Sequence, residues 1–253
     1  MLVPVLRPLS LGEVLDTSFG IYRRLFPSLL FISVFTQTVP LALSVYVQAA
    51  GGVTQHLTLW ALSIGLTLVL SAIGTAASTF VVAETYLGAS ITPQEAFLRS
   101  TPFMGRLIGT SVQMSLVVGL GFVVFIVPGI IAACGLLLTP SALVLEDLRG
   151  GTPAMRRSWE LTRGYRGKVF GALVVAFLLL LIPGAALSAF AVGATLNSVS
   201  EATLVVAVLI VQSLLQILVY PFFYALSTVL YYDLRVRKEG FDLERLAMSL
   251  QQG

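Results

Sequence analysis

Residues 169–194 read VFGALVVAFLLLLIPGAALSAFAVGA, and none of them carries a charge. A helix needs about 20 apolar residues to cross the roughly 30 Å hydrocarbon core of a bilayer. This stretch is long enough, and its apolar residues are continuous rather than alternating with polar ones as they do in a membrane β-barrel strand. It therefore predicts a transmembrane helix and indicates an all-α integral membrane protein.

The rest of the chain has the same composition. Of its 253 residues, 57% are hydrophobic and 11% are charged, whereas a soluble domain carries about 25% charged residues. Five further apolar stretches occupy residues 26–49, 57–83, 107–126, 130–145 and 203–232. We therefore expect a polytopic protein with about six transmembrane helices and a single membrane domain over residues 1–253.

The positive charges predict how these helices are oriented. All fifteen lysine and arginine residues lie before the first stretch, between the second and third, between the fourth and fifth, or after the sixth. The opposite connections, near residues 51–52, 128–129 and 197–200, contain none. Because positively charged loops stay in the cytoplasm, we expect a multi-pass protein of the plasma or inner cell membrane with both termini cytoplasmic. The net charge of +3 is then explained by orientation and anionic lipid, not by nucleic acid.

Three polar segments share one design, in which a capped helix leads into an apolar stretch. Ser10 is followed by Glu13 and Thr92 by Glu95, the spacing of a capping box, while Thr152 is followed by Pro153. This similarity favours a threefold parallel repeat of two-span units, with convergence on a shared interfacial chemistry as the alternative. The expected units are residues 10–91, 92–151 and 152–240, followed by an amphipathic tail at 241–253.

The helices before the apolar stretches have apolar side chains at helical spacing. Leu11, Val14 and Leu15 share a face in the first, Met155 and Trp159 share one in the third, and the C-terminal tail has a similar stripe at residues 243–250. Such helices lie flat at the lipid headgroups or pack under the bundle as a cytoplasmic cap. The sequence leaves both arrangements open.

Prolines recur inside the apolar stretches and can break helices. Broken helices surround the substrate cavity of many transporters, but ordinary kinks and tight turns explain the same residues, and we favour that interpretation. Pro128-Gly129 is a candidate for the turn between the third and fourth stretches, and Pro183-Gly184 is a candidate kink. The full set of candidate kink or cavity residues is Pro40, Pro128, Gly129, Pro183, Gly184 and Pro221.

The densest group of cations lies between the fourth and fifth stretches. A cation close to an anionic membrane surface contributes about 1 kcal/mol of attraction, so this group is a candidate site for lipid headgroups or a phosphate-bearing ligand. Orientation alone is the simpler explanation of the same charges. With the pair before the first stretch, the candidates are Arg156, Arg157, Arg163, Arg166, Lys168, Arg23 and Arg24.

Groups that carry catalysis are scarce in this sequence. Cys134 is the single cysteine and His56 the single histidine, which leaves no combination for a Cys/His metal site or a histidine-based triad. We predict no catalytic residue, no metal and no cofactor. The expected function is that of a non-enzymatic membrane scaffold or lipid-interacting module whose partners are membrane lipids and other membrane proteins. The alternative is a permease for a lipid or a neutral small molecule.

The chain also resembles a known family over nearly its whole length. The resemblance rests on residues 7–16 (RPLSLGEVLD), 22–24 (YRR), 127–130 (VPGI), 157–164 (RSWELTRG) and 230–237 (LYYDLRVR). These motifs resemble the membrane domain of glycerophosphoryl diester phosphodiesterases and related stand-alone multi-span proteins. In those enzymes the hydrolytic site lies in a separate soluble domain, so the resemblance implies a membrane domain and does not imply phosphodiesterase activity.

Overall fold

The structure is a computed structural model that describes residues 7–196 and 201–240. In these ranges every regular element is a helix, which confirms the predicted all-α class. The elements are α1 (Leu11–Ala49), α2 (Leu57–Tyr86), α3 (Pro93–Ser100), η1 (Thr101–Phe103), α4 (Met104–Val124), α5 (Ile126–Leu136), α6 (Thr139–Leu145), α7 (Gly151–Thr162), α8 (Arg166–Leu196) and α9 (Glu201–Glu239).

Six helical stretches of the described chain are long and apolar enough to cross a membrane, as the sequence predicts. Four of them are formed by α1, α2, α8 and α9, each at least 30 residues long. The third stretch combines α3, η1 and α4, and the fourth combines α5 and α6. The fourth stretch is therefore broken into two helices, which the sequence analysis did not predict.

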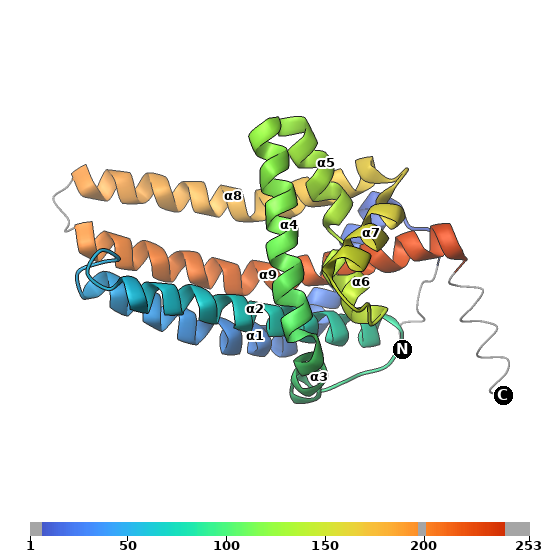
Figure 1. Ribbon diagram of the computed structural model, residues 1–253, viewed down its shortest axis with the longest axis horizontal. Helices are drawn as coiled ribbons and strands as arrows, with labels where there is room; N and C mark the ends of the chain where they lie inside the picture. The colour runs from blue at the N-terminus through green and yellow to red at the C-terminus, as the bar shows by residue number, and fades with distance from the viewer. Residues whose placement is uncertain (1–6, 197–200, 241–253) are drawn as a thin grey trace.

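The four long helices run side by side along the longest axis of the molecule (Figure 1). α1 packs against both α2 and α9, and α9 also packs against α8. The connection between α1 and α2 lies at one end of this bundle, at the left of Figure 1. The beginning of α1, the beginning of α8 and the end of α9 lie together at the other end, which we call the cationic end.

The hairpin of α4 and α5 has a different direction. α4 crosses the four long helices instead of running beside them, and the turn that joins α4 to α5 lies at the side of the bundle (Figure 1). The sequence grouped this turn, near residues 128–129, with the connection at residues 51–52, and the structure does not bring the two together. The first and third predicted units therefore appear as long helix pairs, while the second is a shorter, crossed hairpin, and the threefold repeat stays a prediction.

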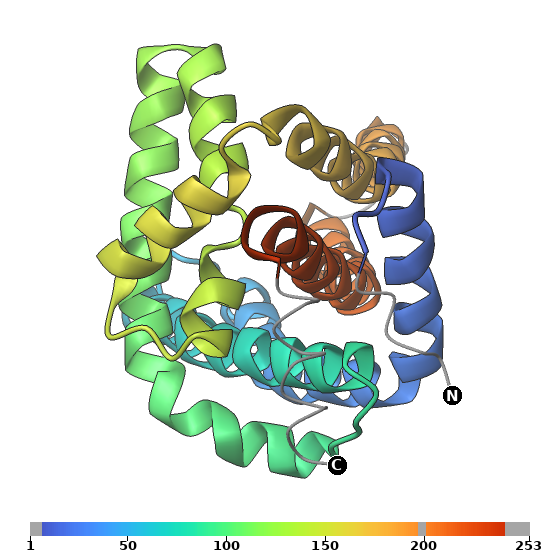
Figure 2. The ribbon, with the colours of Figure 1, turned by 90° about the vertical axis from the view of Figure 1, so that its right-hand side faces the viewer.

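The buried core lies towards the cationic end of the bundle. Figure 2 views this end and shows α9 in the centre, surrounded by the other elements. Tyr231 of α9 is completely buried there, together with Val14 of α1 and Val82 of α2. Away from this end large apolar side chains point outward: Ile182 and Phe190 of α8 are 64% and 71% exposed. Exposed apolar surface on this scale is typical of a helix whose solvent is lipid.

The helix starts agree with two of the three predicted caps. Ser10 accepts a hydrogen bond from the Glu13 amide (3.3 Å), and the Ser10 amide donates to the Glu13 carboxylate (2.7 Å), which completes the capping box. Thr92 caps α3 through the Glu95 amide (3.2 Å), but the Glu95 carboxylate pairs with Arg99 (3.3 Å) instead of bonding back to Thr92, so the capping box predicted here is not closed.

The third predicted cap is wrong. The cap residue of α7 is Gly150, and α7 begins at Gly151, so Thr152 lies inside the helix instead of preceding it. A side chain at Gly151 would collide with Gln113 and Thr110 of α4, because a Cβ atom would lie 2.3 Å from the Gln113 amide oxygen. The first turn of α7 therefore packs directly against α4, and only a residue without a side chain fits at position 151.

The first predicted amphipathic helix turns its apolar face towards the protein. The predicted face of the third is wrong in part, because Trp159 is 37% exposed and α7 buries Ala154, Ser158, Leu161 and Thr162 instead. In the first, Val14 is fully buried and Leu11 and Leu15 pack against the core, and this part of α1 lies across the cationic end of the bundle (Figure 2). α7 packs against α4, α5, α6 and α9, which is the arrangement of a cap beneath the bundle. The tail at 241–253 and the stripe at residues 243–250 lie outside the described residues.

Candidate functional site

The end of α9 holds a buried carboxylate that joins three separate segments. The side chain of Asp233 is 0% exposed and accepts hydrogen bonds from the Leu9 amide (2.7 Å), Lys168 Nζ (2.5 Å) and Arg237 Nε (3.2 Å). Lys168 also donates to the Leu9 carbonyl oxygen (2.6 Å), as does Arg237. We call these four residues the Asp233 cluster. It ties the segment before α1 and the start of α8 to the end of α9.

A second group of charges lies on another face of the same part of α9, where Tyr231, Arg235 and Glu239 alternate with Asp233 and Arg237. Glu146, at the end of α6, accepts hydrogen bonds from Arg157 Nε (2.9 Å) and the Tyr231 hydroxyl (2.7 Å). Arg157 also pairs with Glu239 (2.5 Å), which in turn pairs with Arg235 (3.0 Å). We call these five residues the Glu146 cluster. It joins α6 and α7 to α9.

The two clusters neutralise most of the charge that they enclose. In the Glu146 cluster two arginines face two carboxylates, so the formal charges balance. Burial by itself lowers the pKa of Arg157. The hydrogen bonds to Glu239 and Glu146 raise this pKa by more than burial lowers it, so it lies above the ordinary value. The guanidinium therefore stays charged, and removing either carboxylate would leave a partly buried charge without its partner. The charged side chains of this cluster therefore link α6, α7 and α9.

The structure divides the predicted headgroup residues into two kinds. Arg157 belongs to the Glu146 cluster and Lys168 to the Asp233 cluster. The Arg166 guanidinium lies 4.2 Å above the ring of Trp159, in the geometry of a cation–π contact, with its Nε buried. Arg156 is 81% exposed and pairs with Glu160 (2.9 Å). The sequence brought these cations together in one group but could not show which of them face carboxylates.

The remaining three candidates are open to solvent or lipid headgroups. Arg23 and Arg24 lie in α1, eight and seven residues before Phe31. Arg163 directly follows the last residue of α7. All three are exposed, and none forms an ion pair with another of the described residues. They lie on elements of the cationic end, so this face of the molecule keeps positive charge that its own carboxylates do not neutralise.

The predicted kink residues lie within or next to helices. Pro40 and Pro221 are buried inside α1 and α9, and Pro183 with Gly184 is half-buried inside α8. Each lies inside a continuous helix, and the choice between an ordinary kink and a cavity residue stays a prediction.

Pro128 and Gly129 do not form the turn of their hairpin. The turn is the single residue Phe125, which is extended (φ −163°, ψ 156°), and Pro128 lies in the first turn of α5, where a missing amide hydrogen leaves no bond unmade. The buried Gly129 packs against Gly121 so closely that a Cβ on Gly121 would lie 2.9 Å from the Gly129 Cα. This glycine pair allows α4 and α5 to approach each other.

The break between α5 and α6 is the feature that the sequence analysis missed. Its backbone groups are bonded by α7: the Leu138 amide donates to the Ser158 hydroxyl (3.2 Å), and that hydroxyl donates to the Gly135 carbonyl oxygen (2.7 Å). A Cβ atom on Gly135 would lie 2.2 Å from the Trp159 ring, so only glycine fits there. Gly135 with Pro140 five residues later was the available signal, because both residues weaken a continuous helix.

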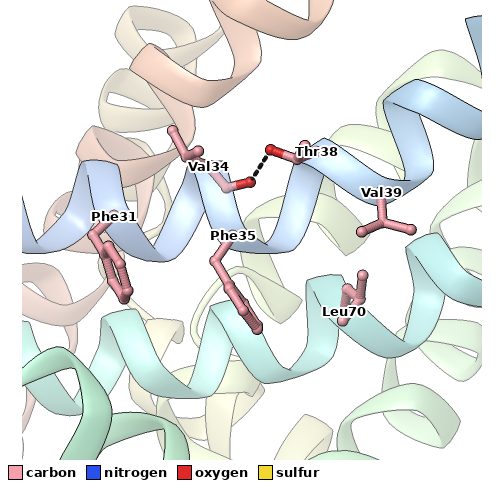
Figure 3. Close-up of a pocket in the computed structure, with 6 residues that line it drawn as sticks. All are labelled: Phe31, Val34, Phe35, Thr38, Val39 and Leu70. Atoms are coloured by element: carbon pink, nitrogen blue, oxygen red, sulfur yellow. Dashed lines mark hydrogen bonds between the residues drawn. The ribbon is translucent and has the colours of Figure 1, made fainter.

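A surface groove lies between α1 and α2 (Figure 3). It has a volume of about 390 Å³, and its lining residues are Phe31, Val34, Phe35, Thr38, Val39 and Leu70. The predicted kink residues are not among these six. The Thr38 hydroxyl donates to the Val34 carbonyl oxygen (2.6 Å), as the dashed line in Figure 3 shows. The groove therefore presents an apolar surface.

Among the described residues no group of three or more histidine, cysteine, aspartate or glutamate side chains could hold a metal ion. No curated protein and no solved structure matches the chain. A family model does match, over residues 53–234, which is more than half of the chain and includes α2 to α8 and most of α9. Its description is a domain of unknown function, DUF7847. The chain therefore belongs to the DUF7847 family.

Proposed function

We propose that this protein is an integral membrane scaffold that binds anionic lipid headgroups at its cytoplasmic face and catalyses no reaction. In this proposal its apolar helices enter the bilayer of the plasma or inner cell membrane, and both termini are cytoplasmic. The long helices α1, α2, α8 and α9 cross it side by side, and the α4–α5 hairpin enters beside them. The observation that carries the proposal is the unequal use of cations at the cationic end.

In the Asp233 cluster and the Glu146 cluster the cations pair with carboxylates of the same protein. Arg23, Arg24 and Arg163, at the same end of the bundle, remain exposed. Unpaired cations where apolar helices emerge are suited to the negative surface of the cytoplasmic leaflet. An integral membrane protein also needs an apolar surface that lipid chains can cover, and the exposed side chains of α8 form such a surface. A scaffold function is also consistent with the break between α5 and α6. The backbone groups of Leu138 and Gly135 at this break bond to Ser158 and are therefore not free to bind a substrate.

The permease stays the alternative function. It would require a path through the bundle, and the groove of Figure 3 lies on the outside, between α1 and α2. The resemblance to the membrane domain of glycerophosphoryl diester phosphodiesterases also stays a prediction, since the DUF7847 match carries no link to those enzymes.

The proposed topology is tested by cysteine labelling in intact cells. With Cys134→Ala as background, Thr54→Cys lies in the α1–α2 connection and Arg149→Cys between α6 and α7, and both positions are exposed. A membrane-impermeant maleimide should label Thr54→Cys in intact cells and Arg149→Cys only after permeabilisation. Labelling of both cysteines in intact cells, or of neither until the cells are permeabilised, would refute the topology.

The headgroup part of the proposal is tested by the lipid that remains with the full chain after mild detergent extraction. The triple variant Arg23→Gln/Arg24→Gln/Arg163→Gln should retain a smaller share of anionic lipid than the wild-type chain. Arg156→Gln is the control, since Arg156 is paired with Glu160 (2.9 Å) on its own helix. An unchanged share in the triple variant would contradict headgroup binding and leave the topology standing.

A further inference from the structure

The groove between α1 and α2 has a lining that selects its occupant. Five of its six lining side chains are hydrocarbon, and the sixth, Thr38, uses its hydroxyl on the Val34 carbonyl oxygen of its own helix. An occupant with polar groups would lose hydrogen bonds to water and find no replacement there. In a helix pair that crosses a bilayer, the apolar molecule within reach is a lipid acyl chain.

Aromatic packing gives the groove a defined wall. Phe97 of α3 packs against Phe35, with ring centroids 5.1 Å apart, and against Phe31 at 6.5 Å. α3 is itself held to the end of α2 by the ion pair of Arg99 with Glu84 (3.1 Å). The rings of Phe31 and Phe35 are therefore supported from a third helix, so the groove exists before a ligand arrives, which lowers the entropic cost of binding.

Positive charge lies next to one end of the groove. Arg24 precedes Phe31 by seven residues of α1, which is about 10 Å of helix, and Arg23 precedes Arg24. Both side chains are exposed and form no ion pair with another described residue, in contrast to Arg99 on the adjoining α3. A phosphate group at Arg23 and Arg24 would place an attached acyl chain at the entrance formed by Phe31.

We propose that this groove is a specific binding site for one anionic phospholipid, with an acyl chain along Phe31, Phe35 and Leu70 and the phosphate at Arg23 and Arg24. The inference rests on the proposed function, because it requires α1 and α2 to cross the bilayer. It adds the lipid class and assigns the acyl chain to one groove among all the apolar surfaces of the molecule.

The test is native mass spectrometry of the full chain in detergent micelles with equal amounts of phosphatidylglycerol and phosphatidylcholine. The wild-type chain should retain phosphatidylglycerol in preference to phosphatidylcholine. Leu70→Trp, which fills the groove, and Arg23→Gln/Arg24→Gln, which removes its charge, should each lower the retained phosphatidylglycerol by about tenfold.

Matched controls separate the site from general effects. Leu181→Trp makes the same substitution at an exposed position of α8, and Arg149→Gln/Arg156→Gln removes two exposed charges elsewhere. Both should retain phosphatidylglycerol as the wild-type chain does. A control that loses as much lipid as its groove counterpart would overturn the proposal.

Three other outcomes are equally informative. Equal retention of the two lipids by the wild-type chain would overturn the assignment of an anionic lipid. Loss in the arginine variant with full retention in Leu70→Trp would overturn the groove and leave headgroup binding intact. Failure of the proposed function itself is recognised separately, because the cysteine labelling at positions 54 and 149 would then place both in one compartment.

Discussion

Single residues of the same type have opposite roles at the cationic end. Arg156 and Arg157 are neighbours in α7, yet Arg156 extends outward to Glu160 on its own helix, while Arg157 joins Glu146 and Glu239 of two other helices. The helix repeat of 3.6 residues explains the difference, since consecutive side chains point about 100° apart. Only one of the two can face α9.

These two arginines provide a matched pair of substitutions. Arg157→Gln should lower the free energy of unfolding by about 2 kcal/mol, because it leaves the partly buried Glu146 and Glu239 with a single arginine, Arg235, between them. Arg156→Gln should change it by less than about 0.5 kcal/mol, as expected for an exposed pair one turn apart. Denaturant unfolding of the full chain in detergent measures both. Equal losses would contradict the role assigned to Arg157.

Asp233 links the start of α8 to the end of α9 through Lys168, and its side chain is 0% exposed. Asp233→Ala should lower the free energy of unfolding by about 3 kcal/mol, because Lys168 and Arg237 would lose the carboxylate that compensates their charge. Asp147→Asn is the control: Asp147 pairs with Arg106 (2.9 Å) but is 76% exposed, asparagine tolerates its positive φ of 48°, and a loss below about 1 kcal/mol is expected. A loss at Asp147 that matched the one at Asp233 would show that burial is not the deciding factor.

At the scale of elements, the corner between α5 and α6 is maintained from outside. α7 supplies Ser158 to the Leu138 amide and the Gly135 carbonyl oxygen, and Thr162 is buried one turn further along. Buried backbone groups without partners are destabilising, particularly in an apolar surrounding. α7 therefore allows a short apolar stretch to change direction.

Replacement of Ser158 tests this dependence. Ser158→Ala should lower the free energy of unfolding by about 1–3 kcal/mol, the range for a buried group left unsatisfied. Ser188→Ala is the matched control, since Ser188 is exposed on α8 and bonds only to the Gly184 carbonyl oxygen of its own helix (2.9 Å). We expect little change there. If thermal unfolding of the two variants coincides, α7 does not stabilise the corner.

At the scale of the whole molecule, the α4–α5 hairpin is the element that departs most from a simple bundle. It crosses the four long helices (Figure 1), and its turn region is exposed and apolar, with Val127 65% exposed. Water would be a poor solvent for such a surface. Within the proposed topology, the hairpin must therefore end in the hydrocarbon region beside the bundle.

A cysteine at the hairpin turn measures this depth. In the Cys134→Ala background, Val127→Cys should stay unlabelled by a membrane-impermeant maleimide before and after permeabilisation, because lipid covers it. Thr54→Cys, at the end of the long helices, is the positive control. Labelling of Val127→Cys in intact cells would instead show that α4 and α5 cross the bilayer completely, in the manner of the other helices.

The sequence was sufficient for properties that depend on local chemistry. Continuous apolar runs such as residues 169–194 predict helices, and the Ser10–Glu13 spacing predicts a capping box that the structure contains. The same applies to the amphipathic start of α1, whose Val14 is buried as the helical spacing indicates. These features are encoded within a few turns of one helix, so distant contacts do not alter them.

Only the tertiary structure decided which charges are available and which direction each helix takes. Arg157 and Lys168 look like headgroup ligands in the sequence, but their carboxylate partners are Glu146, Glu239 and Asp233, up to 82 residues away along the chain in the case of Glu239. The break before α6 likewise depends on Ser158, and the crossing of α4 on its contacts with α2 and α7. The physical reason is that a buried charge or an open backbone group is stabilised by whatever partner the fold brings to it, and sequence spacing does not record that distance.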